Sequence, residues 1–286
     1  MFSGRLIVFV WYSLIDMTLA KWKINNNSLQ IYGKGLFSKD EVTVLINKGS
    51  KGSGIKFRFN NQIIPALVKN VSNSNRNTVL SAGSENICLV EHFLAACSLK
   101  GLDGLSVEVN KPELVFGDGS AIHWCEAFEG SDSFVSQEND FKNNRRSLIE
   151  TIFCKKENKQ IVAIPHDGFK VSYFMDWNHP SLGKLFASWQ LGDDIKKLLR
   201  ARSFATKEEN DYFGASDRLL TLEEKGFNRP LYEPLEPLYH KILDIIGDLS
   251  LSGINTLSIN MHVIGFKSGH ELNVELSRKI NKLFCN

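Results

Sequence analysis

The sequence of 286 residues predicts an α+β fold, a two-domain sandwich in which a unit of strands and helices occurs twice. In each half of the chain, runs that alternate between apolar and polar residues come before helix-favouring runs. Between the halves, residues 131–146 are polar and show no periodicity, as a linker would. The chain is long enough for two modest domains. We therefore expect a first domain over residues 17–130 and a second over residues 147–286.

Strand-like segments in the first half precede two helix-like segments. We expect strands within residues 19–37, 41–49, 54–71 and 105–110. The apolar run at residues 89–99 favours a helix, and a second helix should begin near Ser120, after a turn at residues 117–121. The Gly-Asp-Gly-Ser of this turn lacks the Lys and the spacing of a phosphate-binding loop, so Asp118 and Ser120 are interpreted as turn and helix-cap residues.

The second half repeats this order of segments without clear sequence identity to the first. Its strand-like runs are residues 146–157, 159–167, 170–177 and 257–266. Its helix-favouring runs are residues 195–204, 240–253 and 269–280. The repetition indicates a duplicated α+β unit.

Composition excludes some classes of function. The chain has 34 Lys and Arg residues against 32 Asp and Glu, a net charge of +2, and its basic residues are scattered, so we expect no nucleic-acid partner. The five cysteines are odd in number and include no Cys-x-x-Cys pair. This pattern is typical of reduced thiols in a cytoplasmic protein.

Residues 1–16 form an apolar-rich N-terminal extension. Its apolar run, from Leu6 to Ile15, is too short to span a bilayer, and no small-x-small cleavage site follows it. Met17 stands just before the first strand-like segment. We expect either that translation starts at Met17 or that the extension is a disordered or membrane-touching tail. Finding residues 1–16 by N-terminal sequencing of the native protein would exclude the first alternative.

His240 and Asp244 are the most informative pair in the sequence. If their segment is helical, a spacing of four residues places both side chains on one face, one turn apart. An imidazole and a carboxylate are two of the three protein ligands that a catalytic zinc site usually has. Taken alone, such a pair is more often a capped or salt-bridged surface feature.

Two other segments offer the missing parts of a hydrolytic metal site. His92, in a second helix-favouring run, is the best candidate for a third ligand. Glu91 directly precedes it and could act as a general base toward a water molecule. His270 follows a Ser-Gly turn, where a side chain could stand at the mouth of the site. We expect structural roles for the other histidines, His123, His166, His179 and His262.

Six motifs resemble the zinc-dependent UDP-3-O-acyl-N-acetylglucosamine deacetylase family of lipid A biosynthesis. They are VEHFLAAC (90–97), GLDGLSVEVNKPELVFGDGSA (101–121), DWNHP (176–180), ARSF (201–204), HKILDIIGDLSLSG (240–253) and FKSGHELNVEL (266–276). They occur in the family's order over most of residues 28–280. The resemblance implies a two-domain α+β sandwich with the active site between the domains.

The resemblance also implies a hydrolase that releases acetate and a free amine from the UDP-linked acylated sugar. The implied cofactor is one Zn²⁺ per chain, with Fe²⁺ as an alternative, held by His92, His240 and Asp244. Glu91 would be the general base, and His270 would be the general acid that protonates the leaving amine. We expect a cytoplasmic monomer whose partner is this small-molecule substrate, with no stable membrane insertion.

Four more roles follow from the resemblance. Asp248 would pair with His270 and keep it charged. Lys241 would contact the substrate near the reacting amide or the phosphates, and Phe204 would line the sugar site. Ser203 stands where the family usually has Thr, and its hydroxyl would help to hold the oxyanion.

The sequence departs from the family at two places. Phe37 stands where the family usually has His, at a substrate contact. Residues 205–239 lack the usual Gly-Gly-Ser-Leu motif, so acyl length is not carried over. This leaves two alternatives, a zinc-retaining paralogue that binds a nucleotide sugar or lipid without turnover, and an amidase that acts on a different acylated amino sugar.

Overall fold

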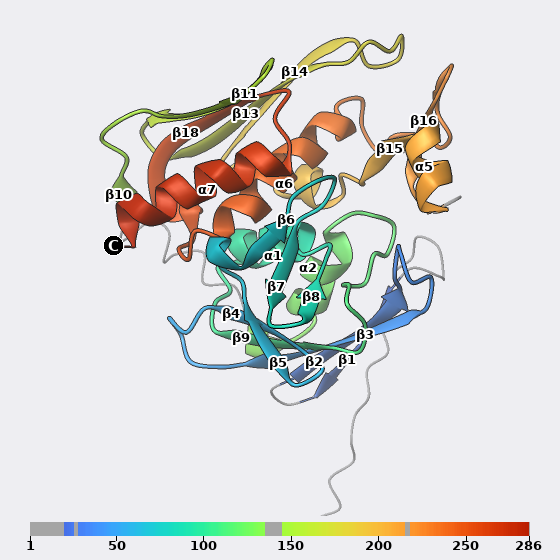
Figure 1. Cartoon of the computed structure of the whole chain (residues 1–286), viewed down its shortest axis with the longest axis vertical. Coiled ribbons are helices and arrows are strands. Elements are labelled where there is room, and N and C mark those ends of the chain that lie inside the picture. The colour runs from blue at the N-terminus through green and yellow to red at the C-terminus, as the bar shows by residue number, and fades with distance from the viewer. Residues whose placement is uncertain (1–19, 26–27, 135–144, 215–217, 286) are drawn as a thin grey trace, which may run out of the picture.

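The chain folds as two outer β-sheets with a layer of helices between them (Figure 1). This computed structural model describes residues 20–25, 28–134, 145–214 and 218–285. The predicted α+β class is confirmed. The N-terminal extension, residues 1–16, and most of the expected linker, residues 131–146, lie outside the described residues. The expected domain boundaries stay predictions.

The first sheet has the strand order β1-β2-β3-β9-β4-β5. Its strands are β1 (Ala20–Asn25), β2 (Ser28–Lys34), β3 (Glu41–Lys48), β9 (Leu105–Val109), β4 (Ile55–Phe59) and β5 (Gln62–Pro65). Neighbouring strands are antiparallel except β9 and β4, which are parallel. Along β3, Val42, Val44 and Ile46 are fully buried and alternate with more exposed residues, so one face packs on the helices.

The second sheet has the order β11-β12-β18-β13-β14. Its strands are β11 (Ile152–Lys156), β12 (Lys159–Pro165), β18 (Ile259–Phe266), β13 (Phe169–Asp176) and β14 (Lys184–Gln190), and β10 (Arg146–Ser147) pairs with the start of β18. In this order β18 and β13 are parallel, and the other neighbouring pairs are antiparallel. The expected strands of both halves are therefore present.

The two halves share one chain order, as the repeated segments predict. Five strands in the first half, and four besides the short β10 in the second, are followed by a small inserted sheet, a helix, one further strand and a final helix. In each half this further strand lies between two of the earlier ones, β9 between β3 and β4 and β18 between β12 and β13. The helices are α1 (Glu91–Lys100) and α2 (Ile122–Glu129) in the first half, and α6 (Glu236–Ser250) and α7 (His270–Phe284) in the second.

The insertions are two three-stranded sheets. The first joins β6 (Val71–Asn73), β7 (Val79–Ala82) and β8 (Glu85–Ile87). The second joins β15 (Phe204–Thr206), β16 (Leu220–Glu223) and β17 (Gly226–Phe227), and α5 (Lys207–Phe213) follows β15. Apart from Phe204, the second lies within residues 205–239, the segment whose sequence departs from the family. There, Ala205 and Leu219 pack with Leu36 and Phe116 in a small apolar cluster of their own.

The helix expected over residues 195–204 is much shorter than the sequence indicates. Only α4 (Lys196–Leu199) forms. Beyond it, the backbone N–H of Ser203 donates to the carbonyl oxygen of Gly119 at 2.8 Å. Arg202 donates from Nε to Glu236 Oε1 at 2.7 Å and from Nη2 to Pro230 O. These tertiary contacts hold residues 202–204 extended, against their helix propensity.

The central contact of the helix layer is between α1 and α6. Gly247 of α6 faces the first turn of α1 so closely that a Cβ at this position would overlap the carbonyl oxygen of Glu91. The side chains around the contact are fully buried, including Phe93 of α1 and Leu243 and Ile246 of α6. Helix packing at this distance requires a residue without a side chain.

In the part of the chain that the structure describes, no helix has the length and apolar character needed to cross a bilayer.

Replacing Gly247 with Ala should lower the free energy of unfolding by about 3 kcal/mol, because a methyl group must enter a packed backbone contact. Thermal unfolding followed by circular dichroism would measure this as a fall in Tm of several degrees. The control is Gly269→Ala, where no atom lies within 4 Å of the added Cβ. Equal Tm values for the two variants would contradict a close helix contact at Gly247.

Candidate metal centre

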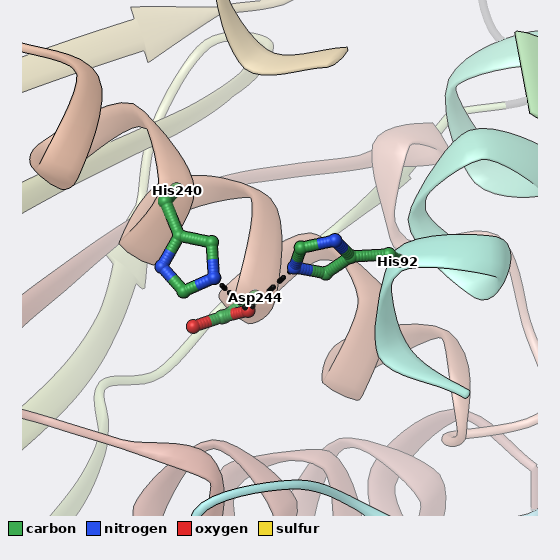
Figure 2. Close-up of side chains that lie close together, drawn as sticks. All are labelled: His92, His240 and Asp244. Carbon is green, nitrogen blue, oxygen red and sulfur yellow. Dashed lines mark ion pairs between the residues drawn. The ribbon is translucent and has the colours of Figure 1, made fainter. Parts of the chain in front are cut away.

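Three candidate metal ligands from two helices meet at one point (Figure 2). His240 and Asp244 lie one turn apart on α6, as their spacing predicts, and His92 is the second residue of α1. Asp244 Oδ1 lies 3.3 Å from His92 Nε2 and 3.6 Å from His240 Nε2. One ligand atom from each residue lies within 4.8 Å of the other two.

This cluster fits a tetrahedral metal ion. Bonds of about 2.0–2.1 Å to a tetrahedral ion place ligand atoms about 3.4 Å apart, close to the two distances from Asp244 Oδ1. That oxygen is buried and has no hydrogen-bond partner among the described residues. A buried carboxylate oxygen without a donor is costly unless a cation completes it. Two imidazoles and one carboxylate are also a donor set that zinc accepts.

The protonation states of the cluster suit a metal. Burial lowers the pKa of His240 well below its ordinary value, which favours the neutral imidazole that ligates metals. Burial alone would raise the pKa of Asp244, but His240, Lys241 and His270 outweigh it and hold that pKa well below its ordinary value. Lys241 contributes directly, because its Nζ lies 2.9 Å from Asp244 Oδ2.

Glu91 begins α1 beside His92 and is buried. Its Oε2 accepts a hydrogen bond from the backbone N–H of Thr78 at 3.2 Å. Burial raises the pKa of this carboxyl group, and the nearby His270 and His92 oppose that effect. Leu89, just before the helix, has a φ of 60°. A non-glycine residue in this left-handed region is strained, which is common beside functional residues.

His270 begins α7 and is held by Asp248 of α6. His270 Nδ1 lies 2.9 Å from Asp248 Oδ2, and its Nε2 lies 4.0 Å from Asp244 Oδ2. Burial alone would lower the pKa of His270, but the carboxylates of Asp248, Asp244 and Glu91 together raise it to about 10. The imidazole is therefore a cation at neutral pH in this arrangement.

Asp248 is fully buried, and both oxygens of its carboxylate accept hydrogen bonds. Besides His270, Thr78 donates from Oγ1 to Oδ1 at 2.6 Å, and Asn273 donates from Nδ2 to Oδ2 at 2.9 Å. The sequence pairs Asp248 with His270 but does not identify Thr78 or Asn273. Thr78 contacts both Glu91 and Asp248, yet it stands 170 positions before Asp248, and no local pattern marks it.

Phe204 and Lys241 lie beside the cluster. The ring of Phe204 is 5.5 Å from that of His240 and 5.4 Å from that of Trp177, measured between centroids. The ammonium of Lys241 lies 5.6 Å from the centre of the Phe204 ring. Ser203 Oγ donates to the carbonyl oxygen of Gly119 at 3.1 Å. This hydroxyl is thus partnered by the backbone.

The other histidines make separate contacts. His262 Nε2 lies 2.8 Å from Ser172 Oγ, His166 Nδ1 lies 3.3 Å from Gly168 O, and His179 Nδ1 accepts from the N–H of Ser181 at 3.1 Å. His123 is buried in α2, and neither of its ring nitrogens has a partner among the described residues. Burial lowers its pKa to about 4.

Comparison with known proteins identifies the family of this chain. The family model for UDP-3-O-acyl N-acetylglycosamine deacetylase matches residues 24–282, a span that contains all three candidate ligands, Glu91 and His270. The chain belongs to this family. It therefore shares the family's deacetylase character, as the six motifs predict.

Several curated relatives cover nearly the whole chain. UDP-3-O-acyl-N-acetylglucosamine deacetylases from Nostoc sp. and Trichormus variabilis are 31% and 30% identical over 87% of this chain and 94% of their own lengths. The enzyme of the same name from Chlamydia abortus is 29% identical over 87% of this chain and 92% of its own.

Removing His240 should lower the metal content of the protein. With His240→Ala we expect well under one equivalent of zinc after dialysis, measured by atomic emission. The control His262→Ala removes a histidine of the second sheet and should retain the wild-type content. Full zinc content in His240→Ala would exclude His240 as a ligand.

Thr78→Val should slow turnover without loss of metal, because the hydroxyl that donates to Asp248 is replaced by a methyl group of similar size. We expect kcat to fall by about tenfold, in proportion to a lost hydrogen bond to a charged group. Thr78→Ser keeps the hydroxyl and should keep most of the activity. Wild-type kcat for Thr78→Val would show that this contact has no part in positioning Asp248.

Proposed function

We propose that this chain is a zinc-dependent hydrolase that removes the acetyl group from UDP-3-O-acyl-N-acetylglucosamine in lipid A biosynthesis. The family membership and the names of the curated relatives support the reaction. The observation that carries the proposal is the convergence of Glu91, His270 and the candidate ligand cluster on one buried point.

His92, His240 and Asp244 would hold the ion. When bound, a divalent metal ion at such a site supplies Lewis acidity, which polarises the substrate carbonyl and acidifies water. Glu91 would accept the proton from the attacking water, since a carboxylate whose pKa burial has raised is a better base. It starts α1 directly beside a ligand, and the N–H of Thr78 fixes one of its oxygens.

His270 would donate a proton to the departing nitrogen. Its Nδ1 is engaged by Asp248, which leaves Nε2 as the nitrogen that can deliver a proton. Asp248 stabilises the imidazolium and sets the orientation of the ring. The proton of His270 is therefore available for donation near neutral pH.

Substrate-binding roles are assigned to residues beside the cluster. Lys241 would contact the reacting amide or a phosphate, and Phe204, packed against His240, would line the sugar site. Ser203 would stabilise the oxyanion, for which its hydroxyl must rotate away from Gly119 O. A UDP-linked substrate places the enzyme in the cytoplasm, where we expect a monomer.

The two alternatives from the sequence are less well supported. A paralogue that only binds its ligand needs neither a buried base nor a charged acid, but both Glu91 and His270 are present with their partners. An amidase for a different amino sugar would use the same groups, and only a turnover assay separates it from the proposed enzyme.

The proposed reaction is tested by incubating the purified, zinc-loaded protein with UDP-3-O-acyl-N-acetylglucosamine and measuring acetate and free amine. Glu91→Ala should retain zinc and lose at least about 100-fold in kcat, as expected when a general base is removed. Glu271→Ala is the matched control, because this exposed glutamate also neighbours a histidine but pairs with Lys156. Normal kcat for Glu91→Ala would remove the base assignment, and no turnover by the wild type would remove the proposed substrate.

The pH dependence of kcat/KM should be bell-shaped. Activity should rise with pH as Glu91 loses its proton and fall at higher pH as His270 loses its own. His270→Gln should have lower activity and no alkaline decline, whereas His262→Gln should keep both limbs. An unchanged alkaline limb in His270→Gln would assign the proton donor to another group.

A further inference from the structure

The outward face of the second sheet carries an unusual concentration of phenylalanine. Phe153 of β11, Phe174 of β13, Phe186 of β14 and Phe266 of β18 are 48%, 41%, 49% and 39% exposed. Phe174 is paired in register with both Phe266 and Phe186, and its ring centre lies 4.5 Å from that of Phe186. We call these four residues the phenylalanine face.

The helix layer lies against the opposite side of this sheet. Figure 1 shows α6 and α7 between the second sheet and the rest of the molecule, with no described helix over the outward side. The inward residues of β13, among them Val171, Tyr173 and Met175, are buried. The phenylalanine face is therefore not part of the core of the described chain.

The first sheet provides an internal comparison, because the two sheets share their strand pairing. A register row across its outward side reads Lys23, Gln30, Leu45, Glu108, Arg58 and Ile63. The corresponding row of the second sheet reads Lys155, Gln160, Phe266, Phe174 and Phe186. The first row is the mixture expected of a solvated face, and the second is not.

Lysines surround the phenylalanine face. The outward charged positions of its strands hold Lys155, Lys170, Lys184 and Asp176, as their pairing with outward neighbours shows. Asp176 is neutralised by Lys267, whose Nζ lies 3.3 Å from Asp176 Oδ2. The three other lysines are in no salt bridge among the described residues. Nearby acids such as Glu157 and Asp167 belong to the turns between strands.

This face adjoins the candidate site through two of its strands. Phe266 lies four residues before His270, and Phe174 lies three residues before Trp177, whose ring packs on Phe204. β13 and β18 both run toward the end of the sheet that carries Phe174, Phe186 and Phe266. From that end the chain continues to residues of the candidate site. A surface that covers these rings would therefore lie close to the candidate site.

We propose that the phenylalanine face docks on the surface of an anionic lipid bilayer. Aromatic rings enter the boundary between headgroups and acyl chains, while lysines around them attract anionic headgroups. The chain would lie on the bilayer without spanning it. The proposal rests on this surface alone and does not depend on the reaction assigned to the metal site.

A second copy of the chain is the main alternative occupant. In a two-fold dimer the same face meets itself, so the lysines of one copy would lie near those of the other. Like charges at such a contact are destabilising. The excess of positive charge on the face therefore favours an anionic partner over another copy.

The test measures sedimentation of the full chain with vesicles of phosphatidylcholine, with and without added phosphatidylglycerol. The wild type should bind the anionic vesicles and release at high salt. Phe174→Ser with Phe186→Ser should weaken binding to both kinds of vesicle, because the two rings no longer enter the headgroup boundary. Replacing Lys155, Lys170 and Lys184 with Gln should weaken binding on the order of 100-fold, at about fivefold for each lysine.

The matched control replaces Lys23, Lys56 and Arg58 of the first sheet with Gln, removing the same charge from the opposite side of the molecule. This variant should bind as the wild type does. Every protein in the comparison keeps residues 1–16, so any contribution of that apolar run is common to all. The replaced residues are exposed, apart from the partly exposed Lys170, so the Tm of each variant should remain at that of the wild type.

Several results would overturn the proposal. Vesicle binding unaffected by both sets of second-sheet changes would place any lipid contact elsewhere. An equal loss of vesicle binding in the first-sheet control would show that binding depends on the net charge of the protein and not on the phenylalanine face. Sedimentation equilibrium showing a wild-type dimer that Phe174→Ser with Phe186→Ser dissociates would make a second copy the occupant.

Discussion

The contact between α1 and α6 at Gly247 determines the geometry of the whole candidate site. Glu91 and His92 begin α1, and Gly247 lies between Asp244 and Asp248 on α6, so the point of closest approach is also where the functional groups face one another. A side chain at 247 would move the first turn of α1 away from α6. The separation of His92 from its partners on α6 is therefore set by a residue with no chemistry of its own.

Two carboxylates one turn apart on α6 differ in how their charges are compensated. Asp248 accepts hydrogen bonds from Thr78, His270 and Asn273, so its charge is compensated without a further cation. Asp244 keeps a buried oxygen without a donor. Both groups are buried, so this difference supports the proposal that Asp248 positions His270 while Asp244 binds an ion.

Local periodicity predicted much of this structure, because the strands and long helices bury one face each. The four-residue spacing of His240 and Asp244 needed only that α6 be helical. Thr78 could not be predicted, since it reaches Asp248 only through the packing of two segments far apart in sequence. The helix expected over residues 195–204 is longer than the one that forms. The contacts of Arg202 and Ser203 that end it are with segments distant in sequence, which local periodicity does not reveal.

The duplicated chain order divides the candidate site between two halves of the molecule. His92 comes from the half that forms the first sheet, whereas His240 and Asp244 come from the half that forms the second. An ion held by all three binds only while the halves are docked, so its binding free energy is also docking free energy. By this linkage, a substitution that loosens the packing between the halves, however distant from the ligands, would weaken metal affinity in proportion to the fraction of molecules whose halves stay docked.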